Sequence, residues 1–194
     1  MKVLAVSGSA RKGGNTATLL EAALTPLREA GFDCELVEIA GQRLEGCTVC
    51  LACRREQDRR CHGRDDIGNA IIEKMDEADA VILGSPVYFG DITPEMKALI
   101  DRAGYVSRGN GNMFARKPGA TVVAVRRAGA MHALDSMNHF FLIGEMVLVG
   151  SSYWNVGVGG DKGSVAEDTE GMNTMRRLGE NLAWVMQRFA EGQA

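Results

Sequence analysis

Residues 3–16 read VLAVSGSARKGGNT, and this stretch is the most informative part of the chain. Its first four residues, 3–6, are apolar and typical of a buried strand. Seven of the ten residues from Ser7 to Thr16 are Gly, Ser, Thr or Asn, and a helix with one apolar face is predicted to follow, with Asn15 as its N-cap. A strand, a small polar loop and a helix N-terminus direct N–H groups and the helix dipole at an anion. The stretch therefore predicts a phosphate-binding loop.

The composition of this loop narrows the kind of phosphate. No Gly-Lys-Ser/Thr ends the loop, so it is not a P-loop, and the spacing of Gly8, Gly13 and Gly14 does not match the dinucleotide pattern G-x-G-x-x-G. Hydroxyl groups outnumber lysines in it. We expect such a loop to bind a terminal phosphate monoester, such as that of FMN.

Downstream of the loop, short apolar runs alternate with segments of helical periodicity. Further strands are predicted at 35–39, 80–83, 120–125 and 146–149, and further helices are predicted to begin near 65, 93, 134 and 170. The alternation predicts an α/β fold in which helices cover both faces of a parallel sheet. With 194 residues, the chain is expected to form a single domain, 1–194, with a cysteine-rich insertion at about 40–64.

Two further loops should lie at the same edge of the sheet as the first. Ligands of open parallel sheets bind beyond the carboxyl ends of the strands. The loop GSPVYFG, 84–90, follows the strand at 80–83 and offers the flat faces of Tyr88 and Phe89, although both rings could instead be core residues. The loop RRAGA, 126–130, follows the strand at 120–125 and is cationic. A phosphate loop, an aromatic turn and a cationic turn together describe an FMN site.

These motifs also carry a family resemblance. GSARKGGNT at 8–16, and GSPVYFG at 84–90 with Lys97, Asp101 and Arg102 downstream, resemble the flavodoxin-like NAD(P)H-dependent FMN reductase family, as does FARKPGA at 114–120. The resemblance implies a flavodoxin-like three-layer sandwich with a five-stranded parallel sheet of order 2-1-3-4-5. It also implies a homodimer or homotetramer in which a neighbouring subunit covers part of the flavin.

The resemblance assigns cofactor-binding roles to three groups of residues. The group implied to hold the FMN phosphate is Ser9, Arg11, Gly14, Asn15 and Thr16. The group implied to line the isoalloxazine ring is Pro86, Val87, Tyr88, Phe89 and Gly90. The group implied at the other edge of the ring is Arg126, Arg127, Ala128 and Gly129. No side chain is expected to act as a catalytic nucleophile, acid or base.

The second motif of the chain is Cys47-x2-Cys50-x2-Cys53-x7-Cys61. Four thiolates suit an iron–sulfur cluster or a structural zinc ion. The motif resembles the compact cysteine motif of iron–sulfur flavoproteins, a branch of the same superfamily that carries a [4Fe-4S] cluster. Its last gap is long, so that His62 is an alternative to Cys61, and free thiols left over from a cluster-binding ancestor are a further alternative. Arginines around the motif either offset an anionic cluster, attract the 2′-phosphate of NADPH or form a solvated surface.

Composition excludes several other classes of function. A net charge of −3 does not favour nucleic-acid binding, and no apolar run has the length of a membrane span. We see no signal peptide, and an odd number of cysteines, five, argues against a secreted disulfide framework. We therefore expect a cytoplasmic protein.

Three functions are compatible with these motifs. The first is an FMN-dependent oxidoreductase that passes electrons from NAD(P)H through bound flavin to an unidentified acceptor. The second is an iron–sulfur flavoprotein electron carrier that exchanges electrons with a ferredoxin-like partner. The third is a binding module with zinc in the cysteine site and no turnover.

Overall fold

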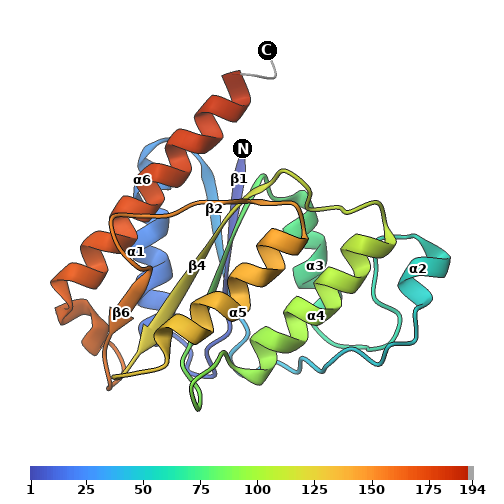
Figure 1. Cartoon of the computed structure of the whole chain (residues 1–194), viewed down its shortest axis with the longest axis horizontal. Coiled ribbons are helices and arrows are strands. Elements are labelled where there is room, and N and C mark those ends of the chain that lie inside the picture. The colour runs from blue at the N-terminus through green and yellow to red at the C-terminus, as the bar shows by residue number, and fades with distance from the viewer. Residues whose placement is uncertain (192–194) are drawn as a thin grey trace.

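The apolar strands lie at the centre of a parallel sheet in the computed structural model, which describes residues 1–191 (Figure 1). The strands are β1 (Lys2–Ser7), β2 (Asp33–Glu38), β3 (Ala80–Pro86), β4 (Pro118–Val125), β5 (Val147–Leu148) and β6 (Val156–Val158). Their order is β2-β1-β3-β4-β5, with β6 also paired to β4. The α/β class and the order 2-1-3-4-5 predicted from the sequence are confirmed.

One edge of the sheet differs from the expected five strands. Both β5 and β6 pair with β4: β5 pairs with its first two residues, 118–119, and β6 with its last three, 123–125. Residues 150–154 leave the sheet between them, since the backbones of Val149 and Asn155 still hydrogen-bond to β4. The sequence did not predict β6 because it is only three residues long and contains Gly157, whose missing side chain leaves room for Leu19.

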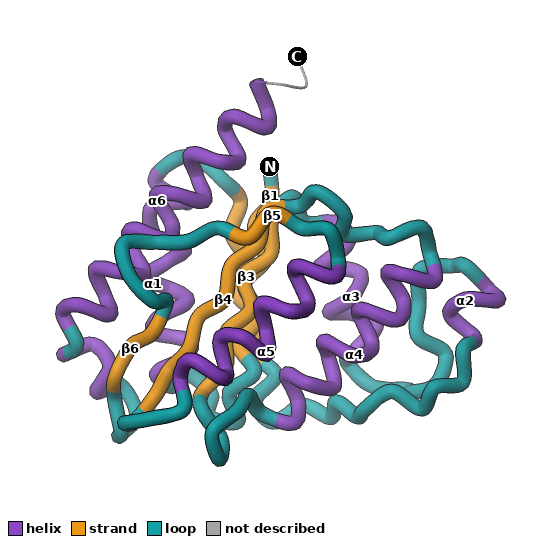
Figure 2. The backbone as a smooth tube through the Cα atoms, viewed as in Figure 1, coloured by secondary structure: helices purple, strands orange, loops and turns teal. Residues whose placement is uncertain are grey.

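Helices cover both faces of the sheet (Figures 1 and 2). One face packs against α1 (Asn15–Glu29) and α6 (Thr169–Glu191), and the other against α3 (Gly68–Glu77), α4 (Pro94–Gly109) and α5 (Ala130–Ile143). Two short helices are α2 (Ala52–Glu56), whose Cys53 joins the cluster of α3, α4 and α5, and the 3-10 helix η1 (Ser164–Glu167), whose Val165 joins the cluster of α1 and α6. Within β1, Val3 and Ala5 join one apolar cluster while Leu4 and Val6 join the other, because successive side chains of a strand point to opposite faces.

Several predicted boundaries are wrong by a few residues. The helix predicted from 134 begins at Ala130, directly after Gly129, whose φ of +89° turns the chain into the helix. The strand predicted at 35–39 is Asp33–Glu38. Asn15 is not an N-cap, because the N-cap of α1 is Gly14 and no side chain caps this helix. No helix within residues 1–191 combines the length and apolar character needed to cross a membrane.

Candidate functional site

The structure brings the three predicted loops to one edge of the sheet. Adjacent strands β1, β3 and β4 run parallel, with Ser7 beside Gly84 and Pro86 beside Ala124, so their carboxyl ends lie together. The N–H of Gly8 donates to the carbonyl of Gly84 over 2.8 Å, which ties the first loop to the second. We call this edge, formed by residues 8–16, 86–91 and 126–129, the loop rim.

Contacts across the loop rim are close. A Cβ added to Gly129 would lie 2.9 Å from both Gly90 Cα and Val87 Cγ1, so the second and third loops touch. Thr93, the N-cap of α4, accepts a hydrogen bond from the Met96 N–H at 3.2 Å and donates one to the Gly8 carbonyl at 2.8 Å. The start of α4 is therefore fixed to the first loop.

The first loop forms a small polar cradle at the N-terminus of α1. Ser9 is buried, and its Oγ accepts a hydrogen bond from the Arg11 N–H at 3.1 Å. The N–H of Gly14 donates to the Arg11 carbonyl, and a Cβ at Gly14 would lie 2.9 Å from that oxygen. Thr16 is 1% exposed, yet its Oγ1 has no hydrogen-bond partner among the described residues. A buried hydroxyl without a partner is costly, and an anion in this cradle would satisfy it.

The Asn15 side chain, which was expected to hold the phosphate, hydrogen-bonds to another loop of the chain. Its amide nitrogen donates to the carbonyls of Gly159 and Asp161, at 3.0 and 2.9 Å. Its amide oxygen accepts the N–H of Gly163 at 2.7 Å. Both ends of the amide are thus engaged, and Asn15 joins the start of α1 to the loop between β6 and η1.

The aromatic loop has a tight turn at its tip. Tyr88 and Asp91 exchange two backbone hydrogen bonds, which places Phe89 and Gly90 at the turn with φ of +48° and +89°. A bulky residue with positive φ is uncommon and strained. Phe89 is fully exposed and Tyr88 is partly exposed, so neither ring is a core residue. Both rings are therefore available to a ligand or a second chain.

The remaining predicted residues also lie on the loop rim. Pro86 ends β3, and the N–H of Val87 donates to the Ala124 carbonyl at 3.0 Å. Arg126, Arg127 and Ala128 are exposed at the end of β4. Two cationic side chains and two aromatic rings thus stand at the same edge as the polar cradle.

The four predicted cysteines lie on the wall of one small cavity, which we call the cysteine cavity. It is formed by the segment between β2 and α3 together with one face of α4. Cys53 is buried, Cys47 and Cys61 are half-buried and Cys50 is exposed. Burial raises the pKa of the Cys53 thiol, and the nearness of the other three thiols raises it further. The fifth cysteine, Cys34 on β2, lies elsewhere.

The backbone of this segment is held in an unusual conformation. Among residues 1–191, eight residues other than glycine have positive φ, and four of them are Val49, Leu51, Gln57 and Arg59. Each such residue costs about 1–2 kcal/mol. The N–H of Val49 donates to Cys47 Sγ at 3.3 Å. The Ala52 N–H and then the Thr48 hydroxyl lower the pKa of the Cys50 thiol. The strained turns thus place N–H groups toward sulfur, which favours thiolates.

Cys61 is fixed more firmly than its neighbour His62. The side chain of Asn69 accepts the Cys61 N–H at 2.8 Å and donates to the Cys61 carbonyl at 2.9 Å. His62 also lines the cavity, but its side chain is exposed and pairs with Asp58 at 3.0 Å. These contacts favour Cys61 over His62 as the fourth ligand.

The four thiols can be compared with the ligand sets of a structural zinc ion and of a four-iron cluster. Within residues 1–191, no three His, Cys, Asp or Glu side chains lie close enough together to hold a single metal ion. Zinc needs sulfurs about 2.3 Å from one ion, whereas a four-iron cluster carries its four cysteines on the outside of a larger core. Four thiols on the wall of one cavity supply the type of ligand that both metal centres use.

A buried ion pair lies beside the cysteine cavity, and one of its members, Arg102, lines the cavity. Arg102 on α4 and Asp66 before α3 have side chains 0% and 1% exposed, and Arg102 Nη1 lies 2.6 and 2.7 Å from the two Asp66 oxygens. Burial alone would raise the pKa of Asp66, but Arg102 and the N–H groups of Glu45 and Gly68 lower it more, and the net pKa is below the ordinary value.

This ion pair was not identified from the sequence, although a signal existed. Arg102 stands at helical spacing from Leu99 and Val106, which are buried apolar residues of α4. A charged residue on the apolar face of a helix indicates a buried partner. The Oδ1 of Asp66 also accepts the Gly68 N–H at 2.9 Å at the start of α3.

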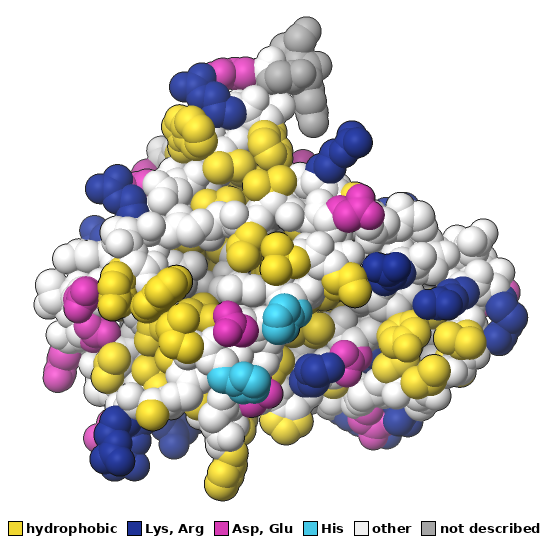
Figure 3. All heavy atoms as spheres, in the orientation of Figure 1, with side chains coloured by type: hydrophobic (Ala, Val, Ile, Leu, Met, Phe, Trp, Pro, Cys, Tyr) yellow, Lys and Arg dark blue, Asp and Glu magenta, His cyan; other side chains and the backbone are white. Residues whose placement is uncertain are grey.

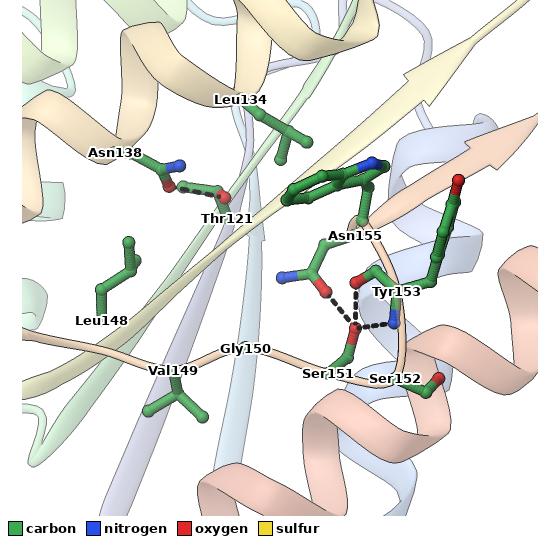
Figure 4. A pocket seen from close by; sticks show the side chains of 11 residues that line it. Thr121, Leu134, Asn138, Leu148, Val149, Gly150, Ser151, Ser152, Tyr153 and Asn155 are labelled. Carbon is green, nitrogen blue, oxygen red and sulfur yellow. Dashed lines mark hydrogen bonds between the residues drawn. The ribbon is translucent and has the colours of Figure 1, made fainter.

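The surface holds two larger hollows that contain none of the predicted site residues. One, of about 430 Å³, lies between α5 and the segment 148–155 (Figure 4). There Thr121 donates to Asn138 at 3.0 Å and Ser151 donates to Asn155 at 2.6 Å. The other, of about 760 Å³, is a groove between α4 and α5.

Known proteins resemble this chain over nearly its whole length. A family model described as NADPH-dependent FMN reductase matches residues 1–161. An iron–sulfur flavoprotein of Methanocaldococcus jannaschii is 37% identical over 193 residues, which cover 96% of this chain and 97% of that protein. An iron–sulfur flavoprotein of Methanosarcina thermophila is 36% identical over 192 residues, 96% of each chain. Among solved structures, a flavodoxin from the domain Archaea has a TM-score of 0.63 and 16% identity, with 96% of this chain and 99% of that chain covered.

Proposed function

Because this chain belongs to the NADPH-dependent FMN reductase family and resembles its iron–sulfur flavoproteins throughout, we propose that it transfers electrons between a [4Fe-4S] cluster and FMN. The cluster would be held by Cys47, Cys50, Cys53 and Cys61, and FMN by the loop rim. The observation that carries this proposal is that these four cysteines, and not the fifth, line one cavity. The more general activity, that of a flavoprotein oxidoreductase, follows from membership of the family.

The residues of the loop rim have distinct tasks in this proposal. The cradle of Ser9, Gly14 and Thr16 would bind the FMN phosphate, with the unpartnered Thr16 hydroxyl as a donor. The rings of Tyr88 and Phe89 would flank the flavin, and the exposed loop 126–129 would contact its other edge. When bound, FMN supplies hydride and single-electron chemistry and the cluster supplies single-electron chemistry.

A second candidate keeps FMN but takes electrons directly from NAD(P)H and passes them to a small acceptor. The exposure of the loop rim favours it, because a nicotinamide needs open access to one face of the flavin. Arg126 and Arg127 are exposed there and could bind phosphate groups of the dinucleotide. The two candidates differ in the electron donor, a ferredoxin-like protein or NAD(P)H.

The test is an anaerobic reconstitution of the full chain with iron, sulfide and FMN. We expect about four irons and one FMN per chain, and a brown protein. Cys53→Ser should lose iron and keep FMN, because Cys53 is the buried thiol of the cavity. Cys34→Ser is the matched control and should keep both, because Cys34 lies outside the cavity.

Two results would reject parts of this proposal. Iron-free wild-type protein after reconstitution would reject the cluster and leave the second candidate, which is then tested by bleaching of the flavin with NADH or NADPH. Protein that binds no FMN under any of these conditions would reject both candidates.

A further inference from the structure

Arg102 carries hydrogen-bond donors that the ion pair with Asp66 does not use. The contacts to Asp66, and one of 3.2 Å to the Glu45 carbonyl, all come from the same nitrogen, Nη1. The N–H groups of Nε and Nη2 are buried and have no partner among the described residues. Unpartnered buried donors are costly, most of all on a charged group. These two donors therefore indicate that a hydrogen-bond acceptor binds next to the Arg102 guanidinium.

The neighbouring space is the cysteine cavity. Arg102 lines this cavity together with the four cysteines. An arginine side chain is always charged near neutral pH, so the guanidinium brings a positive charge to this wall. The buried cation and the thiols therefore share one wall.

The position of the guanidinium is fixed by its surroundings. A Cβ added to Gly68 would lie 2.5–2.6 Å from three atoms of the guanidinium, so α3 leaves it no room to withdraw. Each Asp66 oxygen also accepts a backbone N–H at 2.9 Å, from Gly68 and from Glu45, which keeps the carboxylate in place. Asp66 thus acts as an anchor that holds Arg102 against the cavity.

We propose that Arg102 is a positioning residue for the cluster, which donates hydrogen bonds from Nε and Nη2 to the sulfur atoms in the cysteine cavity and raises the reduction potential of the cluster. This inference rests on the proposed function. Reduction adds a negative charge to the cluster, and hydrogen bonds to sulfur and a nearby cation stabilise the reduced form more than the oxidised form. The Asp66 carboxylate is bound to Nη1 and does not line the cavity, whereas Arg102 does, so the cation is the nearer charge.

The test measures the midpoint potential of the cluster by anaerobic EPR-monitored titration of reconstituted full-length protein. Removal of Arg102 alone would leave a buried carboxylate and endanger the fold. The main variant is therefore Arg102→Met combined with Asp66→Asn. We expect the ratio of reduced to oxidised cluster at a fixed potential to fall about tenfold, a shift of about 59 mV for one electron. Asp66→Asn alone keeps the cation and should leave the potential unchanged or raise it.

Two more variants separate this role from a structural one. Arg102→Lys keeps the charge with fewer donors and should restore part of the potential lost in the double variant. Arg64→Met is the matched control, because Arg64 belongs to the same segment but pairs with Glu45 and does not line the cavity. Its potential should equal that of the wild type.

The outcomes distinguish this inference from the function on which it rests. Wild-type protein without iron overturns both. Wild-type protein with a cluster whose potential is the same in the double variant and in Arg102→Lys overturns the inference and leaves the function standing. If the double variant binds FMN but loses its cluster, while Asp66→Asn keeps it, Arg102 is required at the cluster and the inference is supported.

Discussion

At the scale of single residues, the hydroxyl of Thr16 gives the most direct test of the phosphate cradle. It is buried and unpartnered. Thr16→Val removes this hydroxyl and keeps the shape of the side chain. We expect FMN affinity to fall about tenfold, or about 1.4 kcal/mol, because one hydrogen bond to a charged phosphate is lost. The unfolding free energy of the FMN-free protein should stay the same or rise, because an unsatisfied group is removed.

The control for this prediction lies on the same helix. Thr25 is half-buried on α1, and its Oγ1 donates to the Glu21 carbonyl at 2.9 Å, far along the helix from the loop. Thr25→Val should leave FMN affinity unchanged in fluorescence titration. Equal affinities for Thr16→Val and wild type would show that the phosphate binds elsewhere.

Phe89 combines a strained backbone conformation with a fully exposed side chain. Its φ of +48° is strained for a bulky side chain, and its full exposure means that no packing offsets the strain. Phe89→Asn should raise the unfolding free energy of FMN-free protein by about 1 kcal/mol, because asparagine tolerates this conformation better. The same variant should weaken FMN binding, because a ring next to the flavin is lost.

A substitution of the neighbouring turn residue, Gly90, should change the unfolding free energy in the opposite direction. Gly90 has a φ of +89° and open space around a Cβ built on it, so only the backbone resists a side chain there. Gly90→Ala should lower the unfolding free energy by about 1 kcal/mol in urea denaturation. If Phe89→Asn and Gly90→Ala changed stability in the same direction, the turn would not have the conformation described.

The sequence was sufficient to predict which residues form the loop rim, but it did not predict which hydrogen bonds their side chains make. Motif and strand order together sufficed to place 8–16, 84–90 and 126–129 at one edge, because parallel strands end on the same side. The role of Asn15 could not be predicted, since its partners Gly159 and Gly163 are distant in sequence and belong to a loop after a strand that gave no signal. Local pattern found the loops and the start of α1 to within one residue, whereas contacts between distant parts of the chain depend on the fold.

At the scale of elements, the segment between β2 and α3 is held to α4 by a buried ion pair. Asp66→Asn should lower the unfolding free energy by about 3 kcal/mol at pH 7, because the buried guanidinium of Arg102 loses its charged partner. The measurement is urea denaturation of FMN-free and iron-free protein. Lys97→Met is a fair comparison, because its pair with Asp101 on the same helix is exposed and should contribute less than about 1 kcal/mol.

This ion pair also predicts a pH dependence. The folded pKa of Asp66 lies below the unfolded value of about 3.9, so the stability that its ionisation contributes is fully present above about pH 4. That stability is lost only as the pH falls through the folded pKa. The difference between wild type and Asp66→Asn should therefore be constant between about pH 7 and 5 and shrink below about pH 4. A difference that shrinks already between pH 7 and 5 would contradict a lowered pKa.

The cysteine segment was predictable in its chemistry and not in its shape. The spacing of Cys47, Cys50 and Cys53 predicted convergent thiols, and the structure brings them to one cavity with Cys61. The short helix α2 and the turns at Val49 and Leu51 were not predicted, because these residues disfavour positive φ. Here contacts with α4, such as the stacking of Arg54 on Tyr105 at 5.6 Å, override local preference.

At the scale of the whole molecule, α4 connects the two candidate redox sites. Thr93 fixes its first turn to the loop rim, and Arg102, nine residues later, lines the cysteine cavity. Figure 1 shows the helix running from the loops beyond the sheet toward α2. At about 1.5 Å per residue, the two positions are about 14 Å apart along the helix axis. Relative placement of the two sites therefore depends on one rigid element.

The exposed apolar surface of α5 predicts self-association. Leu142 and Ile143 are 61% and 62% exposed beside the groove between α4 and α5, and apolar side chains are also visible on this face in Figure 3. Exposed apolar surface of this kind marks interaction sites. We expect a homodimer or homotetramer in solution, as the family resemblance implied. Leu142→Lys combined with Ile143→Lys should give monomers in light scattering, because buried lysines without partners oppose association.

The control uses an exposed apolar residue of the opposite layer. Trp184 on α6 is 59% exposed, and Trp184→Lys should leave the mass unchanged. If a neighbouring subunit covers part of the flavin, the monomeric variant should also bind FMN more weakly than the wild type, although no residue of the loop rim has been changed. A monomeric wild-type protein, or dissociation caused by Trp184→Lys alone, would place the interface elsewhere. Equal FMN affinity in monomer and oligomer would mean that each loop rim is complete within one chain.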